Sequence, residues 1–327
     1  MQKVAVFTHG IDIDGYGCAV LANLAYGENT QVLYADNFNL DEIFIKEWKR
    51  GWLNNFDKVF ITDHCPSMNL CLKIQDDPQL LEKITVFDHH ASRLEEQGSL
   101  DWVHIIDNNE KGKQSGTSLF FDYLAKNGLV NRGGSVQEFV ELTRQYDTWE
   151  WTKLQNPIPN ELNTLAMAIG REKYVENMTK KLSKQKSIFL FSAQDLLDIK
   201  TYKEEFKKQV EHYISQIKVI EFQGNKVGYI QIKDLFKNDI AQTVRTLPLS
   251  KEIDYLLMPI PDRGTVSLRS IKPDFDVSSV AKENGGGGHK AAASFPLYNL
   301  KIDTKKSFCK TLENVWKIKK NLKVVKI

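Results

Sequence analysis

The 327-residue sequence has few of the features that mark a secreted or membrane protein. Its four cysteines include no C-x-x-C pair, and their spacing fits neither a disulfide framework nor a zinc knuckle. They are Cys18, Cys65, Cys71 and Cys309. No apolar run approaches the roughly 18 residues of a membrane span, and the first residues lack the apolar stretch of a secretory signal. We therefore expect a cytoplasmic protein with reduced cysteines.

The formal net charge of the whole chain is only +2, but acidic and basic residues are unevenly distributed along it. Residues 1–180 carry 26 acidic and 17 basic side chains, a balance of −9, whereas residues 181–327 carry 16 and 27, a balance of +11. This asymmetry favours cation binding in the first part and anion binding in the second. A lysine-rich solvated surface explains the charge alone equally well.

The length predicts about two domains. In the first half, short apolar runs alternate with helical patterns, which is typical of a parallel sheet covered by helices. The predicted strands are 3–8, 31–35, 59–62, 84–87 and 103–106, and the predicted helices are 16–26, 42–52, 68–75, 115–126, 136–146 and 160–169. A lysine-rich helical stretch follows, and strands then return at 219–223, 226–232, 255–259 and 266–271, with helices at 240–246, 277–283 and 305–322.

The predicted fold class is therefore α/β. We expect a catalytic domain with a parallel sheet and flanking helices over residues 1–186 and a helical linker over 187–218. A smaller α/β domain is expected over 219–327.

Acidic and imidazole side chains gather where these strands end, which is where parallel α/β sheets bind ligands. Four of the seven histidines lie there. The residues are His9, Asp12 and Asp14 after the first strand, Asp63 and His64 after the third, Asp88, His89 and His90 after the fourth, and Asp147 in a later helix. One such aspartate is more often a helix cap or a turn residue. Three successive strand ends instead indicate a site for divalent metal ions, of which two can bind phosphoryl oxygens and lower the pKa of a bridging water.

With these residues the sequence resembles the DHH phosphoesterase superfamily, which is named after the Asp-His-His triplet found here at residues 88–90. HGIDIDG over residues 9–15 is similar to the first motif of the family, Asp63 to its second and Asp147 to its fourth. SGTSLFF over 115–121 is similar to the small-residue helix start after the triplet. In the second half, GGGGHKAA over 285–292 is similar to the signature of the DHH-associated C-terminal domain, and Arg269 to its arginine.

The resemblance implies two manganese ions, with magnesium or cobalt as alternatives. His9, Asp12 and Asp63 would hold one ion, and Asp14, Asp63, His89 and Asp147 the other. Asp88 would orient its neighbours, and His90 would face the substrate phosphate or the leaving oxygen. The family usually places one or three residues between the first histidine and the next aspartate, whereas Gly10 and Ile11 make two here, which weakens the assignment of Asp12. The role of His64 stays open between supporting the metal ligands and filling the core.

The residue types of the glycine-rich segment themselves indicate an anion-binding site. Gly286, Gly287 and Gly288 allow a ligand to approach the backbone closely, and their N–H groups can bind an anion. His289 and Lys290 add donors and charge, and Arg269 can hold a terminal phosphate through two hydrogen bonds. A flexible loop is the competing interpretation for the glycines alone.

The resemblance implies a hydrolase that degrades short RNA oligonucleotides to mononucleotides in a cleft between its domains, with 3′-phosphoadenosine 5′-phosphate as a further substrate. A phosphodiesterase of cyclic or linear dinucleotides shares every residue above. A single-strand DNA exonuclease is less favoured, because members of that branch are usually longer and carry an additional nucleic-acid-binding domain. A nucleotide-binding module without activity would lack some of the metal-ligating residues, all six of which are present here. The sequence predicts no membrane partner and leaves the cleavage polarity and the oligomeric state open, a homodimer included.

Overall fold

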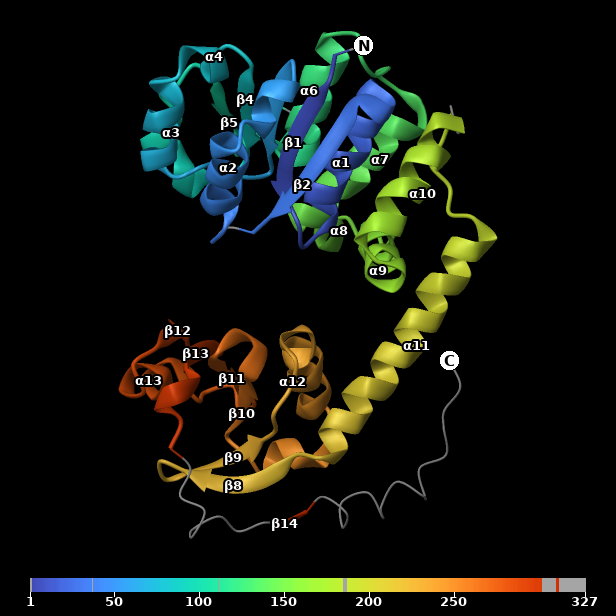
Figure 1. Cartoon of the computed structure of the whole chain (residues 1–327). Coiled ribbons are helices and arrows are strands. Elements are labelled where there is room, and N and C mark those ends of the chain that lie inside the picture. The colour runs from blue at the N-terminus through green and yellow to red at the C-terminus, as the bar shows by residue number, and fades with distance from the viewer. Residues whose placement is uncertain (1, 37, 111, 185–186, 302–309, 312–327) are drawn as a thin grey trace. The chain divides into compact units, whose positions relative to one another are not determined.

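The chain divides into two compact units, Met1–Tyr202 and Lys203–Ile327, each with its own core (Figure 1). The computed structural model describes residues 2–36, 38–110, 112–184, 187–301 and 310–311. The helix expected over 305–322 lies outside these residues, except for Lys310–Thr311, which form a short strand, β14. None of the described helices is long and apolar enough to cross a bilayer.

The first unit is built on a five-stranded parallel sheet, as predicted. The strands are β1 (Val4–His9), β2 (Thr30–Ala35), β3 (Lys58–Thr62), β4 (Ile84–Asp88) and β5 (Val103–Ile105). Their order is β2-β1-β3-β4-β5, and all four pairings are parallel. The order reverses at β1, which lies between β2 and β3. In open α/β sheets the crevice outside the carboxyl ends of the strands at such a reversal is the usual ligand site.

Both faces of this sheet are buried, and successive side chains of β1 point to opposite faces. Val4 and Val6 pack in one core cluster, and Ala5 and Phe7 pack in the other. Figure 1 shows the corresponding helical layers. The first layer contains α1 (Ile13–Tyr26), α6 (Gly116–Lys126), α7 (Gly134–Asp147), α9 (Ile158–Ile169) and α10 (Arg171–Lys184); the second contains α2 (Leu40–Lys49) and α3 (Met68–Gln75).

The shorter elements of the first unit lie between these. They are α4 (Pro78–Leu81), α5 (Leu94–Gln97), α8 (Glu150–Lys153) and a small hairpin of β6 (Asn108–Asn109) and β7 (Gly112–Lys113). The helix α8 follows α7 directly.

Most helices agree with the prediction to within three residues at each end, and three differences have a clear physical cause. The first begins at Ile13 rather than Tyr16, because the Asp12 carboxylate accepts hydrogen bonds from the N–H groups of Asp14 and Gly15 and caps the helix. The long helix expected over 187–218 is shorter, α11 (Ala193–Ser215), and β8 already begins at Lys218. The helix α10 was not predicted, although buried Tyr174, Met178 and Leu182 recur at helical spacing.

The second unit is a mixed sheet with a helix on each face. Its strands are β8 (Lys218–Phe222), β9 (Asn225–Tyr229), β10 (Tyr255–Ile260), β11 (Thr265–Ser270), β12 (Gly287–His289), β13 (Ala292–Pro296) and β14. Their order is β12-β13-β11-β10-β9-β8-β14, and β9–β10 is the parallel pair among the described strands. Ile240 of α12 (Lys237–Arg245) packs in one core, and Val277 of α13 (Val277–Glu283) packs in the other. The predicted α/β class is therefore confirmed for both units.

Candidate metal centre

The carboxyl edge of the first sheet brings the predicted acidic and imidazole residues together. His9 ends β1 and Asp63 directly follows β3, and these strands are hydrogen-bonded neighbours whose last paired residues are Thr8 and Thr62. Asp88 ends β4, the next strand. The site therefore forms where the strand order reverses, because the fold leaves the ends of β1 and β3 side by side.

The first cluster consists of His9, Asp12 and Asp63. His9 Nδ1 lies 3.2 Å from Asp12 Oδ2 and 3.6 Å from Asp63 Oδ2. Asp63 has a φ of 55°, in the left-handed region that few side-chain-bearing residues adopt, although aspartate tolerates it better than most. This backbone strain at the end of β3 is of the kind that accumulates at functional sites.

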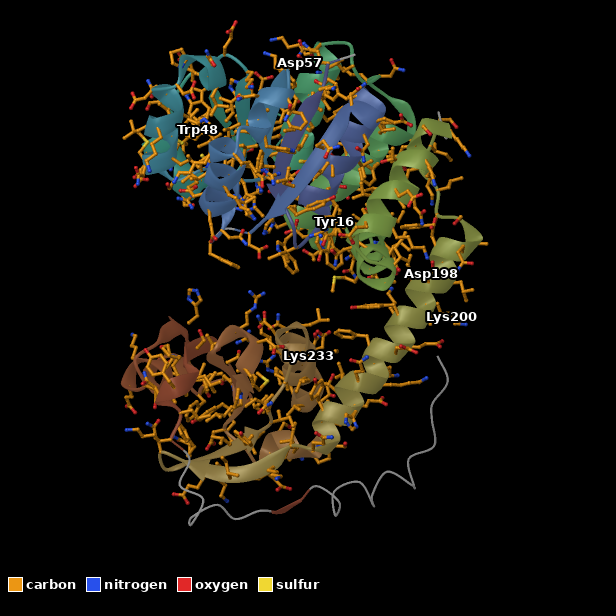
Figure 2. The ribbon with its side chains drawn as sticks, viewed as in Figure 1. Tyr16, Trp48, Asp57, Asp198, Lys200 and Lys233 are labelled. Atoms are coloured by element: carbon orange, nitrogen blue, oxygen red, sulfur yellow. The ribbon has the colours of Figure 1, made fainter. Side chains whose placement is uncertain are left out.

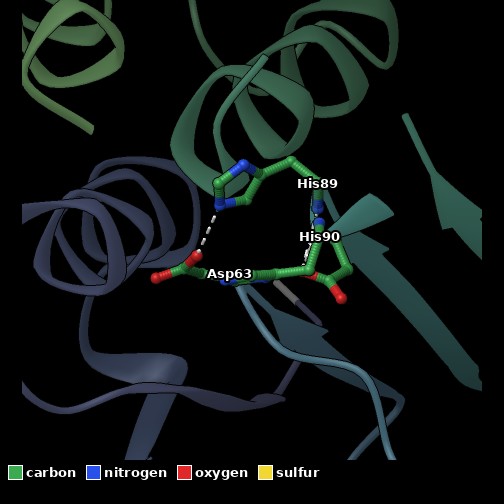
Figure 3. A group of neighbouring side chains, drawn as sticks. Asp63, His89 and His90 are labelled. Carbon is green, nitrogen blue, oxygen red and sulfur yellow. Dashed lines mark hydrogen bonds and ion pairs between the residues drawn. The ribbon is translucent and has the colours of Figure 1, made fainter. Parts of the chain in front are cut away.

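The second cluster is centred on His89 Nε2, whose contact with Asp63 is drawn in Figure 3. That nitrogen lies 3.2 Å from Asp63 Oδ1, 3.5 Å from Asp147 Oδ2 and 3.8 Å from Asp14 Oδ2. Asp147 is the last residue of α7, and Asp14 lies in the first turn of α1. The two oxygens of Asp63 thus face different clusters, one oxygen each.

The donor atoms fit divalent metal ions. Two ligand atoms that each lie about 2.1 Å from one ion at roughly a right angle are about 3 Å apart, close to the separations found in both clusters. Asp63 Oδ2 and His89 Nε2 are buried without a hydrogen-bond partner among the described residues, a condition that a bound cation would relieve. Carboxylate and imidazole together suit manganese, cobalt or magnesium to different degrees.

The charges of the two clusters also favour the binding of divalent cations. Burial alone would lower the pKa of His9, but the neighbouring carboxylates of Asp12 and Asp63 outweigh burial and raise the pKa to about 10. Burial likewise opposes the rise at His89, where Asp63, Asp14 and Asp147 raise the pKa to about 10. In the metal-free chain both imidazoles therefore hold protons that partly neutralise the carboxylates, and a divalent cation would take over that role.

Asp14 is completely buried, and its position is fixed by the start of α6. The backbone N–H of Gly116 donates to Asp14 Oδ2 at 2.7 Å, and that of Thr117 donates to Asp14 Oδ1 at 2.9 Å. Burial, reinforced by the charges of Asp63 and Asp147, raises the pKa of Asp14 well above its ordinary value. A carboxylate at a helix N-terminus is stabilised by the helix dipole, so α6 offsets part of the free-energy cost of burying the charged form of Asp14.

Gly116 also explains why the SGTS segment contains a small residue. A Cβ at this position would lie 2.5 Å from the Cβ and 2.7 Å from the Cα of Asp63, so a larger residue would displace Asp63, the residue common to both clusters. The role of Thr117 and Gly116 as backbone donors could not be inferred from their side chains.

Asp88 interacts with His90 rather than with the ring of His89. His90 Nδ1 lies 2.7 Å from Asp88 Oδ1, and the backbone N–H of His89 donates to the same oxygen at 2.8 Å. The hydrogen bond to Asp88 raises the pKa of His90. His90 is the more exposed of the two histidines, which leaves its Nε2 as the atom that can reach a substrate.

The loop between His9 and Asp12 is held by residues that the sequence did not single out. The N–H of Gly10 donates to the carbonyl of Ala35 at 3.0 Å, and the Tyr16 hydroxyl donates to the carbonyl of Gly10 at 3.1 Å. Arg171, the first residue of α10, places its guanidinium 3.9 Å from the centre of the Tyr34 ring, with Nη1 3.5 Å from the Gly10 carbonyl oxygen. The two-residue spacing thus forms an anchored loop that keeps Asp12 beside His9.

His64 supports this cluster without belonging to it. Its Nε2 lies 2.9 Å from the Ala35 carbonyl oxygen, and its ring packs edge-on against His9 with 4.7 Å between the ring centres. Burial lowers the pKa of His64, so the ring is neutral and its Nε2–H donates to Ala35. His64 therefore packs against a candidate ligand and is not among the groups of ligand atoms found together in the described residues.

In the second unit, the sheet register aligns Arg269 and His289. Arg269 of β11 pairs with Ala292 of β13, and His289 of β12 pairs with the same alanine from the other side. Directly opposed residues of antiparallel strands share a face, so both side chains lie on one face with a small residue between them. Arg269 donates to the neutral oxygens of Asn238 and Ser267, which leaves its charge available to an anion.

The glycine-rich segment is an ordered edge strand rather than a flexible loop. A Cβ on Gly286 would lie 2.1 Å from the carbonyl oxygen of Ser294, and Gly288 has a φ of 143°. The close approach of β13 therefore requires glycine here. Gly287 has open space around its Cα, and His289 and Lys290 are exposed.

No family model matches the chain. The oligoribonuclease NrnB of Bacillus subtilis (strain 168) is 28% identical over 300 residues, which cover 88% of this chain and 71% of that protein.

Solved structures share the fold at lower identity. The exonuclease RecJ bound to manganese has a TM-score of 0.50 and 16% identity, over 90% of this chain and 86% of its own. The DHH domain of a protein assigned to a family of ribosomal proteins has a TM-score of 0.51 and 14% identity, over 99% and 88%. The fold shared with RecJ and with this DHH domain, together with the similarity to NrnB, supports the resemblance to the DHH phosphoesterase superfamily that the triplet at residues 88–90 and the strand-end motifs indicate.

Proposed function

We propose that the protein is a manganese-dependent phosphodiesterase that hydrolyses short RNA oligonucleotides to mononucleotides. The observation that carries this proposal is the pair of ligand clusters that share Asp63, with its two oxygens facing His9 and His89. The similarity to NrnB, an oligoribonuclease, supports the substrate class, and the manganese held by RecJ supports the metal.

The ligands divide naturally between two ions. One ion would be held by His9, Asp12 and Asp63; the other would be held by Asp14, Asp63, His89 and Asp147. When bound, two such ions would supply Lewis-acid polarisation of the phosphoryl oxygens and would lower the pKa of a water near the phosphate. The chain itself supplies the alignment, because the N–H groups of α6 and the anchored loop at Gly10 fix the carboxylates before the substrate binds.

His90 is the group proposed to serve the leaving oxygen. Asp88 accepts a hydrogen bond from its Nδ1–H, which orients the ring and leaves Nε2 for the substrate. As the bond between phosphorus and the leaving oxygen breaks, a proton on Nε2 passes to that oxygen, and the water oxygen has formed the new bond to phosphorus.

The second unit is proposed to bind the phosphate groups of the substrate. Arg269 and His289 share a sheet face, and the exposed Lys290 follows directly. A guanidinium with neutral partners binds phosphate through two parallel hydrogen bonds. We expect substitution of Arg269 or His289 to raise KM far more than it lowers kcat.

The test is hydrolysis of end-labelled RNA of two to five nucleotides, with and without manganese. Linear and cyclic dinucleotides, 3′-phosphoadenosine 5′-phosphate, longer RNA and single-stranded DNA are assayed beside it. Release of mononucleotides from the short RNAs supports the proposal. Absence of release from every RNA oligomer, or a strong preference for cyclic dinucleotides, refutes the stated substrate.

The two ends of β3 offer a matched pair of variants. Asp63→Asn removes a carboxylate from the carboxyl end and should abolish hydrolysis. Asp57→Asn removes one from the amino end, where Asp57 is exposed and accepts a hydrogen bond from the Lys3 N–H. Figure 2 shows Asp57 at the opposite end of the unit from Tyr16, which follows the metal ligands of α1. Asp57→Asn should retain full activity, and full activity in a folded Asp63→Asn protein would rule out the two-metal mechanism.

A further inference from the structure

The turn that follows Asp147 holds a tryptophan in an unusual backbone conformation. Trp149 has φ 60° and ψ 13°, one of four positive φ values among the described non-glycine residues. Large aromatic residues rarely adopt this left-handed conformation, and they do so where the surrounding structure imposes it.

Hydrogen bonds on both sides impose the conformation here. The N–H of Trp149 donates to the carbonyl of Tyr146 at 3.1 Å, and the Thr152 hydroxyl donates to the carbonyl of Trp149 at 2.8 Å. The neighbouring Glu150 is tied to Arg144 by an ion pair at 2.8 Å. The turn is thus a rigid link between the last residue of α7 and α8.

This rigid turn presents an indole to solvent. Trp149 is 66% exposed, although burying an aromatic ring would stabilise the fold. The ring of Trp151 stacks beside it, with 6.3 Å between ring centres and 28° between the planes. Trp151 therefore supports the Trp149 ring from one side, and much of the indole remains open to a ligand.

The position relative to the metal ligands identifies the kind of ligand. Trp149 is two residues from Asp147, so their Cα atoms are at most about 7.6 Å apart. A phosphate held at Asp147 and His89 carries a sugar and a base within about that distance. Aromatic side chains beside a backbone-binding site commonly stack unpaired bases, and they do so with little regard to base identity.

We propose that Trp149 is a stacking platform for a nucleobase of the substrate. This inference rests on the proposed function and adds a base-binding subsite to it. Because every base has a π face, the subsite would let one enzyme process short oligonucleotides of any sequence. A protein or membrane partner would instead use the exposed apolar side chains of this turn together, Leu154 included, which is 59% exposed.

The experiment compares wild-type protein with Trp149→Ala, Trp149→Phe and Leu154→Ala on RNA trimers. Each nucleotide of the trimer is replaced in turn by an abasic one. Loss of a stacked base corresponds to a rise in KM of about 5- to 150-fold. We expect this rise, with kcat within a few-fold of wild type, for Trp149→Ala on intact RNA and for the wild type when one particular base is missing. The two losses should not add, Trp149→Phe should retain most of the affinity, and Leu154→Ala should behave as wild type.

Two results would overturn the inference. One is a Trp149→Ala protein that still distinguishes intact from abasic RNA as well as wild type does. The other is a Leu154→Ala protein as impaired as Trp149→Ala, which would indicate a general apolar docking surface.

Failure of the proposed function has a different signature, namely no RNA hydrolysis by the wild type at all. In that case calorimetric titration with AMP and with ribose 5-phosphate decides the inference. A preference for AMP that disappears in Trp149→Ala would sustain the stacking subsite, and equal binding of the two ligands by wild type would overturn it.

Discussion

Gly116→Ala is the substitution whose effect follows most directly from the geometry. The added Cβ would lie 2.5 Å from Asp63 Cβ, whereas ordinary contacts begin at 3.4 Å, so the start of α6 must retreat by about 0.9 Å. The added Cβ would meet the Cβ and backbone atoms of Asp63, which no side-chain rotation can move away. The same movement can stretch the 2.7 Å hydrogen bond from Gly116 to Asp14 to at most about 3.6 Å, where the bond is largely lost.

Two energetic costs follow. Overpacking costs about 1–3 kcal/mol, and the weakened hydrogen bond to a charged acceptor adds about 1–2 kcal/mol. For a unit of about 200 residues, each kcal/mol lowers Tm by about 2–4 °C, so the total cost of about 2–5 kcal/mol should lower Tm of the metal-free protein by about 4–20 °C. Displacing groups that orient metal ligands typically weakens metal binding by about 10- to 100-fold, and we expect a loss of that size here.

The assay is calorimetric titration with MnCl₂ combined with thermal unfolding. Gly128→Ala is the matched control, because Gly128 has a φ of 69° and open space around it. That variant should lose about 1–2 kcal/mol of stability through backbone strain and keep its manganese affinity. A Gly116→Ala protein whose manganese Kd lies within twofold of wild type would refute the reasoning.

Two further predictions concern the same centre. Manganese affinity should rise with pH between about 6 and 8, because His9 and His89, with pKa values of about 10 in the metal-free chain, must release protons to bind metal. The sign for folding is opposite: these raised pKa values stabilise the metal-free fold fully below about pH 6.5, and that stabilisation is lost as pH rises toward 10. Titration at pH 7 in two buffers of different ionisation enthalpy should reveal proton release, and zero release would contradict both statements. Arg171→Ala should weaken manganese binding several-fold by freeing the Gly10 loop, whereas Glu172→Ala, which removes only the exposed ion-pair partner of Arg171, should not; equal Kd values for the two variants would count against the anchoring role.

Much of the first unit could be predicted because its signals are local. Apolar runs that end in Asp or His gave the strands and the ligand residues together, and the parallel arrangement required the strand ends to share one edge. The residues that hold the ligands carried no comparable signal. Gly116 and Thr117 act through backbone N–H groups. Arg171 contacts the Gly10 carbonyl although 161 positions separate the two residues in the sequence.

Errors in the second half have a similar physical origin. The helix expected over 187–218 is shorter at both ends: Phe189 and Phe191 pack on the core of the first unit ahead of α11, and Lys218 already pairs with Tyr229 in β8. The glycines at 286–288 could be read as a loop because nothing local indicates that Ser294 and Phe295 pass within contact distance.

Asp12 has two duties with a consequence for how such a protein can diverge. Its carboxylate caps α1 through the N–H groups of Asp14 and Gly15 and also faces His9. Asparagine caps helices as well as aspartate does but carries no charge for a metal. Selection for a stable fold would therefore tolerate asparagine at this position, and selection for hydrolysis would not. Under the proposed function, one change from aspartate to asparagine would therefore remove the chemistry and leave the fold intact.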